Sequence, residues 1–109
     1  TLNEIARSAR VGMELEEADI PVKPDVAAAC ELLGLDPLYV ANEGKLICLC
    51  EADDAERLLA VMRSHPHGWE AALIGKVVED ENGMVRMRTG FGGQRVVDWL
   101  AGEQLPRIC

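Results

Sequence analysis

Two hydrophobic periodicities alternate along the chain, and they predict helices and strands in turn. Residues 2–9 repeat apolar side chains with the i, i+3, i+4, i+7 spacing of a helix, at Leu2, Ile5, Ala6 and Ala9. Residues 11–17 alternate instead, and glutamates face away from an apolar side formed by Val11, Met13 and Leu15. The chain therefore opens with a short helix followed by a strand.

The next stretch predicts a second helix and a buried strand. Pro21 marks a loop, and Pro24 suits the first turn of a helix that Gly34 closes. This helix has an apolar stripe made of Val26, Ala29, Cys30 and Leu33. Residues 45–50 are apolar after the initial lysine, which indicates a strand buried on both faces.

The second half of the chain predicts a third helix and a β-meander. Residues 51–64 have acidic side chains in the first turn and an inner face formed by Ala55, Leu58, Leu59 and Met62. We expect strands at residues 72–79, 84–89 and 95–99. The sequence Asn82-Gly83 is typical of a tight hairpin turn between the first two of these strands, because both residues adopt positive φ angles easily.

This order of elements predicts the fold class. Helix, strand, helix, strand, helix and meander indicate an α/β (α+β layered) domain, with helices packed on a mixed or mostly antiparallel sheet. The chain has 109 residues, enough for one domain with a small core. We expect the domain to span residues 1–99, followed by a flexible tail at residues 100–109. Because the chain opens directly in a helical pattern, we expect it to be truncated at its N-terminus.

Composition and charge exclude several functions. The formal net charge is -8, and an acidic domain repels phosphate backbones, so we expect no nucleic-acid partner. No apolar run approaches the ~20 residues that span a bilayer, and no signal peptide opens the chain, so we expect no membrane contact. Cys30, Cys48 and Cys50 lack the spacing of a disulfide framework or a zinc site. We expect them to be small core residues in a reducing compartment, which predicts a cytoplasmic protein.

The last residue, Cys109, has three possible interpretations on composition alone. It can be incidental. It can be lipidated, although no second cysteine stands near it and no polybasic stretch precedes it. It can also carry a chemical group, because a tail extended by Pro106 can bring its tip to more than one active site. The neighbouring α-carboxylate disfavours the thiolate and Arg107 offsets part of that effect, so this thiol would need activation inside a partner's site.

The sequence Asn42-Glu43-Gly44 also has two interpretations. It is a turn between two extended runs, in which glycine provides the bend. Alternatively, Glu43 is a general acid or base at the end of a buried strand, if burial raises its pKa. The residues alone favour the turn.

The remaining motifs favour structural roles. His65 and His67 flank a proline in a loop, so we expect solvated side chains and no metal site. The glycine-rich stretch "GFGGQ" lies between two strands and lacks the helix N-terminus of a phosphate cradle, which favours a turn. Trp69 and Trp99 are expected to be packing residues.

Five segments in order along the chain resemble a known family. The ending "LPRIC" is similar to the C-terminus of the HypE family of hydrogenase maturation factors, as are "TLNEIA", "YVANEGKL", "ALIGKV" and "GGQRVVDWL". This resemblance covers essentially the whole chain and is most specific in the tail. It implies the C-terminal domain of the AIR synthase-like superfamily, whose N-terminal domain holds most of the nucleotide site and the dimer contact.

The resemblance implies a definite reaction. A partner, HypF, places a carboxamide on the sulfur of Cys109, and ATP, with Mg, is used to phosphorylate the carboxamide oxygen. Loss of phosphate and a proton leaves a thiocyanate, and the cyanide passes to an iron held by a HypC–HypD complex. Glu43 is the expected base for the carboxamide nitrogen, and Asn42 is expected to orient it. The family acts as a homodimer, and a piece without the N-terminal domain is expected to bind no ATP and to be inactive alone.

Two alternatives come from other functional classes. The chain could be a non-catalytic interaction module that docks a partner through its tail. It could also belong to a different ATP-using enzyme of the same superfamily.

Overall fold

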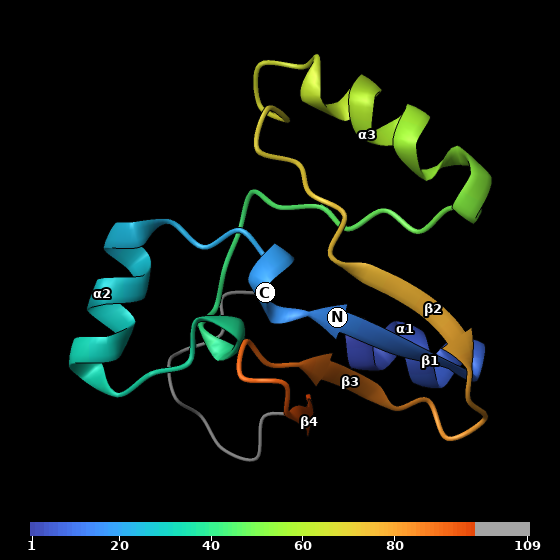
Figure 1. The fold of residues 1–109 in the computed structure, drawn as a ribbon. Coiled ribbons are helices and arrows are strands. Elements are labelled where there is room, and N and C mark those ends of the chain that lie inside the picture. Colours follow the sequence, from blue (N-terminus) through green and yellow to red (C-terminus); the bar gives the residue numbers. More distant parts are fainter. Residues whose placement is uncertain (98–109) are drawn as a thin grey trace. The chain divides into compact units, whose positions relative to one another are not determined.

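The computed structural model describes residues 1–97 and divides the chain into two compact units (Figure 1). The first, called the sheet unit below, contains residues 1–21 and 55–97 of the described part. The second, called the 22–54 unit, contains residues 22–54. The predicted tail at residues 100–109, including Cys109, and the predicted strand end with Trp99 lie outside the described residues.

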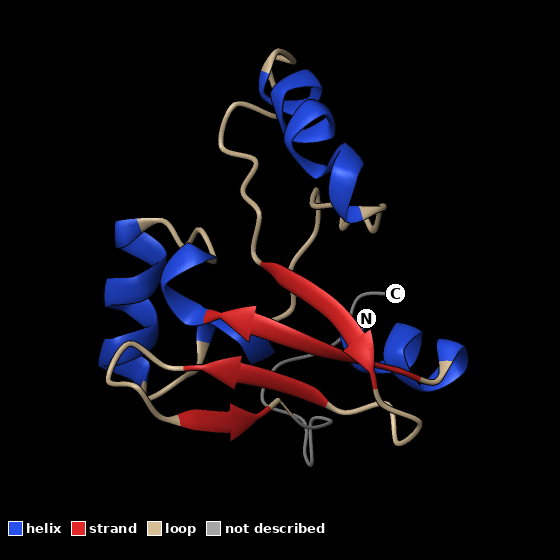
Figure 2. Ribbon diagram, turned by 45° about the vertical axis from the view of Figure 1, so that its right-hand side comes forward, coloured by secondary structure: helices blue, strands red, loops and turns tan. Residues whose placement is uncertain are grey.

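The sheet unit is built on four strands in the order β2-β1-β3-β4 (Figure 2). These strands are β1 (Val11–Glu16), β2 (Gly75–Glu79), β3 (Val85–Arg88) and β4 (Gln94–Val96). Strand β1 pairs antiparallel with β2 and parallel with β3, and β3 pairs antiparallel with β4. The sheet is therefore mixed, as the sequence predicts.

Helix α1 (Leu2–Ala9) packs on one face of this sheet and encloses the core. Ala6 of the helix clusters with Met13 and Leu15 of β1 and with Val85 and Met87 of β3, and all five side chains are buried. Of the side chains expected on the two apolar faces, Ala6, Met13 and Leu15 are thus buried, and Leu2 and Ile5 pack against them. Val11 is only half-buried, and Ala9 is exposed. The helix ends at Arg10, which adopts φ 55° and donates its backbone N–H to the carbonyls of the preceding turn.

The opposite face of the sheet is charged. Lys76 Nζ lies 3.3 Å from Glu14 Oε2, and Arg88 Nε lies 3.3 Å from Glu16 Oε1, so each glutamate of β1 pairs with a cation on a neighbouring strand. These pairs are partly exposed and each stabilises the fold by no more than about 1 kcal/mol. Their main effect is on register, because a shift by one residue would bury both glutamates.

The predicted hairpin between residues 72–79 and 84–89 is wrong. Strands β2 and β3 do form there, but β1 lies between them, so they are not partners. The Asn82-Gly83 turn exists, with Gly83 at φ 64°, and it passes the end of β1 instead of joining adjacent strands. A turn sequence predicts chain reversal, and it does not say whether a third strand fills the space between the two arms.

Helix α3 (Ala55–Arg63) follows a short 3-10 turn, η3 (Ala52–Asp54), in the region predicted as a helix. The four residues predicted for its inner face are half-buried, and the remaining positions of the helix are exposed. After the helix, Arg63 Nε donates to the carbonyl of Ala71 at 2.9 Å and ties the loop to the helix end.

The 22–54 unit contains helix α2 (Pro24–Leu33) and a 3-10 turn, η2 (Pro37–Tyr39). Pro24 stands in the first turn and Gly34 closes the helix with φ 68°, both as predicted. The predicted apolar stripe is not buried as a whole, because Cys30 is buried whereas Val26 and Leu33 are exposed.

The strand predicted at residues 45–50 is wrong for the described structure. These residues have no regular secondary structure and are all exposed. A strand buried on both faces needs neighbours on its edges and faces, and none of the described residues pairs with this segment. Cys48 and Cys50 are consequently exposed thiols, and of the three cysteines predicted for the core only Cys30 is buried.

The buried side chain of Met87 gives the first testable prediction. Met87→Ala should lower the free energy of unfolding by about 2–5 kcal/mol, because it removes a fully buried side chain and leaves a cavity. Phe91→Ala, at a fully exposed position, should change it by no more than about 0.5 kcal/mol. Urea titration followed by circular dichroism measures both, and equal midpoints for the two variants would contradict the core assignment.

The second prediction concerns Gly83, which combines a positive φ with a close approach to α1. A Cβ at Gly83 would lie 2.9 Å from Arg7 Cα, whereas a Cβ at Gly92, also at positive φ, would meet nothing within 4 Å. Gly92→Ala should therefore cost about 1 kcal/mol from backbone strain alone, and Gly83→Ala should cost at least about twice as much. The same titration tests this, and an equal cost at both positions would show that the α1 contact is unimportant.

Candidate functional site

Asn42, Glu43 and Gly44 lie on a bend in the 22–54 unit. The chain leaves α2 through Gly34, passes through η2, and reaches the bend, where Gly44 adopts φ 71°. Asp36 caps η2, since its side chain accepts a hydrogen bond from the backbone N–H of Leu38 at 2.9 Å. These local interactions hold the approach to the bend, and the predicted glycine bend is confirmed.

The Glu43 side chain is exposed, and so is that of Asn42. Among the described residues the Glu43 carboxylate forms no hydrogen bond or ion pair. Nothing in the described part of the chain therefore desolvates or orients it. Cys109 lies outside the described residues, so the expected approach of the thiol to Glu43 stays a prediction.

The histidine loop and the glycine-rich loop behave as turns. The backbone N–H of His67 donates to His65 Nδ1 at 3.1 Å, and both side chains are exposed. Residues 1–97 contain no group of three or more histidine, cysteine, aspartate or glutamate side chains that could hold a metal ion. The "GFGGQ" stretch joins the antiparallel strands β3 and β4 as a turn, which confirms that prediction.

Trp69 does not pack as predicted, because its side chain is 67% exposed. A tryptophan in a loop belongs to no periodic hydrophobic pattern, so its residue type alone predicted burial poorly here.

None of the helices in residues 1–97 has the length and the apolar composition that a membrane span needs.

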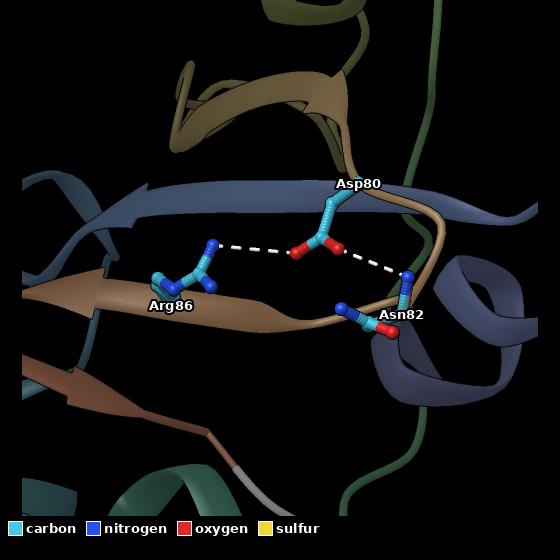
Figure 3. Close-up of polar contacts among 3 residues, drawn as sticks. All are labelled: Asp80, Asn82 and Arg86. Carbon is cyan, nitrogen blue, oxygen red and sulfur yellow. Dashed lines mark hydrogen bonds and ion pairs between the residues drawn. The ribbon is translucent and has the colours of Figure 1, made fainter.

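A polar cluster that the sequence did not predict lies at the turn between β2 and β3 (Figure 3). Asp80 accepts a hydrogen bond from the backbone N–H of Asn82 at 3.0 Å, and its Oδ2 lies 3.3 Å from Arg86 Nη1. The Asp80 side chain is 12% exposed and crosses β1 at Gly12, where a Cβ would come within 2.7 Å of Asp80 Cβ. An isolated glycine inside a predicted strand was the signal for this close approach.

This cluster fixes the turn and offers no reactive group. Both aspartate oxygens are engaged, and the hollow beside Arg86 and Arg88 has a volume of about 10 Å³, room for one water molecule at most. A wider, open hollow next to β2 is lined by three valines and by the charged residues Arg10, Glu79, Asp80 and Glu81, and its lining includes no histidine, cysteine or hydroxyl side chain. Neither hollow contains Asn42 or Glu43.

Comparison with curated proteins shows extensive similarity. The chain is 68% identical over 109 residues to the carbamoyl dehydratase HypE of Azotobacter vinelandii, covering 100% of the chain and 32% of that protein. It is 50% identical over 108 residues to the carbamoyl dehydratase HypE of Escherichia coli K12, covering 99% of the chain and 32% of the relative. The chain thus spans about a third of the length of these relatives.

Solved structures show the same fold. A crystal structure of the hydrogenase maturation protein HypE matches with a TM-score of 0.91 and 48% identity, over 99% of this chain and 36% of that one. HypE in complex with ATP matches with a TM-score of 0.89 and 47% identity, over 99% of this chain and 33% of the other. HypE in a HypE–HypF complex matches with a TM-score of 0.82 and 41% identity, over 89% of this chain and 31% of the other.

A family model settles the wider assignment. The model of AIR synthase related protein, C-terminal domain, matches residues 1–88, which include every strand of the sheet except β4. The resemblance to HypE inferred from the sequence is confirmed by the curated relatives and the solved structures. The chain belongs to the AIR synthase related proteins, of which it forms the C-terminal domain.

Proposed function

We propose that this chain supplies the carrier thiol and one catalytic carboxylate of an ATP-dependent carbamoyl dehydratase that makes cyanide for nickel–iron hydrogenase. The observation that supports this most is the match to a carbamoyl dehydratase over all 109 residues, at 68% identity. Among the similar structures, HypE has been solved with ATP and with HypF, which are the nucleotide and the carbamoyl donor of the proposed reaction.

The reaction begins on the Cys109 sulfur. HypF acts as the carbamoyl donor: the thiol loses its proton and the sulfur bonds to the carbamoyl carbon, while the bond from that carbon to the donor's leaving group breaks, which leaves an S-carboxamide on the tail. An amide oxygen is a poor leaving group, and phosphorylation by ATP turns it into a good one. The C–O bond then breaks as phosphate departs with the bonding electrons, and an S-thiocyanate remains. The S–C bond then breaks as the cyano group passes to an iron held by HypC–HypD, and two electrons from this acceptor complex leave the sulfur as a thiolate and the group as cyanide.

Glu43 acts as the base in this scheme. The carboxamide nitrogen loses one proton when its oxygen is phosphorylated and the second when phosphate leaves, so a proton acceptor must lie beside it. Asn42 orients the nitrogen or the carboxylate through its amide. The Gly44 bend supports this assignment, because it leaves both side chains exposed and available to an incoming tail.

ATP, with Mg, binds elsewhere in this proposal. Within residues 1–97 no glycine-rich turn connects a strand to a helix N-terminus, the arrangement that usually holds a phosphate. The nucleotide site and the homodimer contact are therefore assigned to the two-thirds of a HypE-type protein that this chain does not match.

Cys109→Ala tests the carrier role. The variant is made in a fusion protein, in which this chain replaces the 109 residues that it matches in the Azotobacter vinelandii relative. After incubation with HypF, carbamoyl phosphate and ATP, mass spectrometry of the C-terminal peptide should show the modified thiol in the parent fusion and no modification in the variant. Cys109→Ser should bind HypF and also fail to be modified. Active hydrogenase from either variant would overturn the carrier role.

Glu43→Gln tests the base in the same fusion protein. The variant should accept the carboxamide at the parent rate and form thiocyanate at least about 100-fold more slowly, because glutamine cannot take a proton. Glu81→Gln, a change of the same kind on the exposed turn of the sheet unit, should form thiocyanate at the parent rate. Single-turnover mass spectrometry separates the two steps, and unchanged thiocyanate formation in Glu43→Gln would remove this residue from the mechanism.

A further inference from the structure

The turn at residues 80–83 places an exposed asparagine side chain next to the backbone nitrogen of a buried glycine. Asn82 is exposed, whereas Gly83 is buried. When glycine follows asparagine, its nitrogen can attack the side-chain amide easily, because glycine has no Cβ to block the close approach. The residue pair that predicts a turn is therefore also a pair with chemical reactivity of its own.

The reaction is deamidation, and water is its only co-reactant. The Gly83 nitrogen loses its proton and bonds to Cγ of Asn82, while the bond from Cγ to the amide nitrogen breaks and that nitrogen leaves as ammonia with the proton. Water then opens the resulting five-membered imide at one of its two carbonyl carbons and returns a proton to the Gly83 nitrogen. Opening at Cγ gives aspartate, and opening at the backbone carbonyl gives isoaspartate.

The observed turn opposes the first step. The Gly83 N–H donates to the Asp80 carbonyl at 3.0 Å, and neither Glu81 nor Asn82 has a positive φ, so the turn is of type I. In such a turn ψ of the third residue is about 0°, which points the following nitrogen away from the side chain of that residue. The imide can therefore form only after this hydrogen bond breaks and the Asn82 backbone rotates.

Asp80 keeps the turn closed through its backbone and its side chain. The Asp80 carbonyl holds the Gly83 N–H, and the Asp80 carboxylate accepts the backbone N–H of Asn82 at 3.0 Å (Figure 3). The carboxylate is itself fixed, because Oδ2 lies 3.3 Å from Arg86 Nη1 and the side chain is only 12% exposed. Opening of the turn thus breaks two hydrogen bonds that end on one residue.

We propose that Asn82 is a deamidation site that the closed turn keeps unreactive, and that it reacts when the turn opens. Asp80 is the positioning residue, since it accepts the hydrogen bonds of both residues that react. Two such bonds lower the population of the open turn about 30-fold. The modification accumulates only in molecules whose turn has opened, so it is a chemical record of local opening in the sheet unit.

The products do not fit the closed turn. Isoaspartate adds a methylene to the backbone next to Gly83, where space is short: a Cβ on Gly83 would lie 2.9 Å from Arg7 Cα and 3.1 Å from the Ala6 carbonyl oxygen. Either product also adds a carboxylate directly after residues 79–81, which are all acidic, and like charges at this distance repel. Deamidation therefore weakens the contact between the turn and α1.

Mass spectrometry of the peptide that contains Asn82 tests the proposal in the fusion protein. One sample is incubated folded and a second is incubated unfolded in guanidinium chloride, at the same pH and temperature. The folded parent should deamidate at Asn82 at least about tenfold more slowly than the unfolded parent. Equal rates in the two samples would overturn the proposal.

Variants of Asp80 and its neighbour locate the protection in the turn. The folded rate of each variant is divided by its own unfolded rate, which removes the effect of residue type. Asp80→Ala should raise this ratio at least about fivefold, because it removes the acceptor of the Asn82 N–H. Asp80→Asn retains an acceptor and should keep most of the protection, and Glu81→Ala, at an exposed position, should keep all of it. An unchanged ratio in Asp80→Ala would exclude the positioning role.

Met87→Ala separates opening of the turn from unfolding of the whole sheet unit. It removes a fully buried core side chain and leaves the turn residues in place. The ratio in this variant should stay within about twofold of the parent while circular dichroism shows a folded protein, and an increase equal to that in Asp80→Ala would overturn local opening. Met87→Leu, which changes the core volume little, replaces it if Met87→Ala does not fold. These measurements need neither HypF nor ATP, so they are independent of the proposed function.

Discussion

The sheet unit depends on strand β1, which is bonded along both edges and differs on its two faces. Its backbone groups pair with β2 on one side and β3 on the other. Met13 and Leu15 enter the core under α1, while Glu14 and Glu16 meet cations on the charged face. A shift of one residue would bury two carboxylates without partners, at a cost comparable with the whole stability of a small domain. This constraint fixes where β2 and β3 attach, although both come much later in the chain.

The elements that the sequence predicts correctly are those whose signals are local. The spacing of Leu2, Ile5 and Ala6 places a helix, and the alternation around Met13 and Leu15 places a strand with the right face inward. Glycine caps are equally local, which is why the end of α2 is correct. Strand order is different, because it depends on contacts between distant segments. The Asn82-Gly83 turn is compatible with a hairpin of adjacent strands and also with a connection that passes the end of β1. Only Gly12, which makes room for Asp80, indicated the connection past β1.

The strand predicted at residues 45–50 shows a different limit. The apolar composition of the segment indicates a buried strand, but the described residues do not cover it, and the structure shows it exposed. Both observations are consistent if the composition of a segment reflects the environment that the segment has in the whole protein. The same reasoning applies to Leu32 and Leu33 of α2. Apolar patterns in this chain therefore predict burial correctly for residues 2–9 and 11–17, and incorrectly for residues 45–50 and most of the α2 stripe.

The candidate site could be predicted only through resemblance, and there is a physical reason for this. Glu43 sits on an exposed bend, and the hollows of the described residues contain neither it nor Asn42, so no local geometry marks it as reactive. A hydrated carboxylate is a weak base toward an amide proton, and excluding water strengthens it. A cysteine thiol is likewise a poor nucleophile until it is deprotonated, which a partner's site can promote. Low reactivity in transit suits a carrier, because a carboxamide or thiocyanate must survive between sites. In the proposed function, reactivity is therefore a property of the assembled protein, and the separate residues stay inert until assembly brings them together.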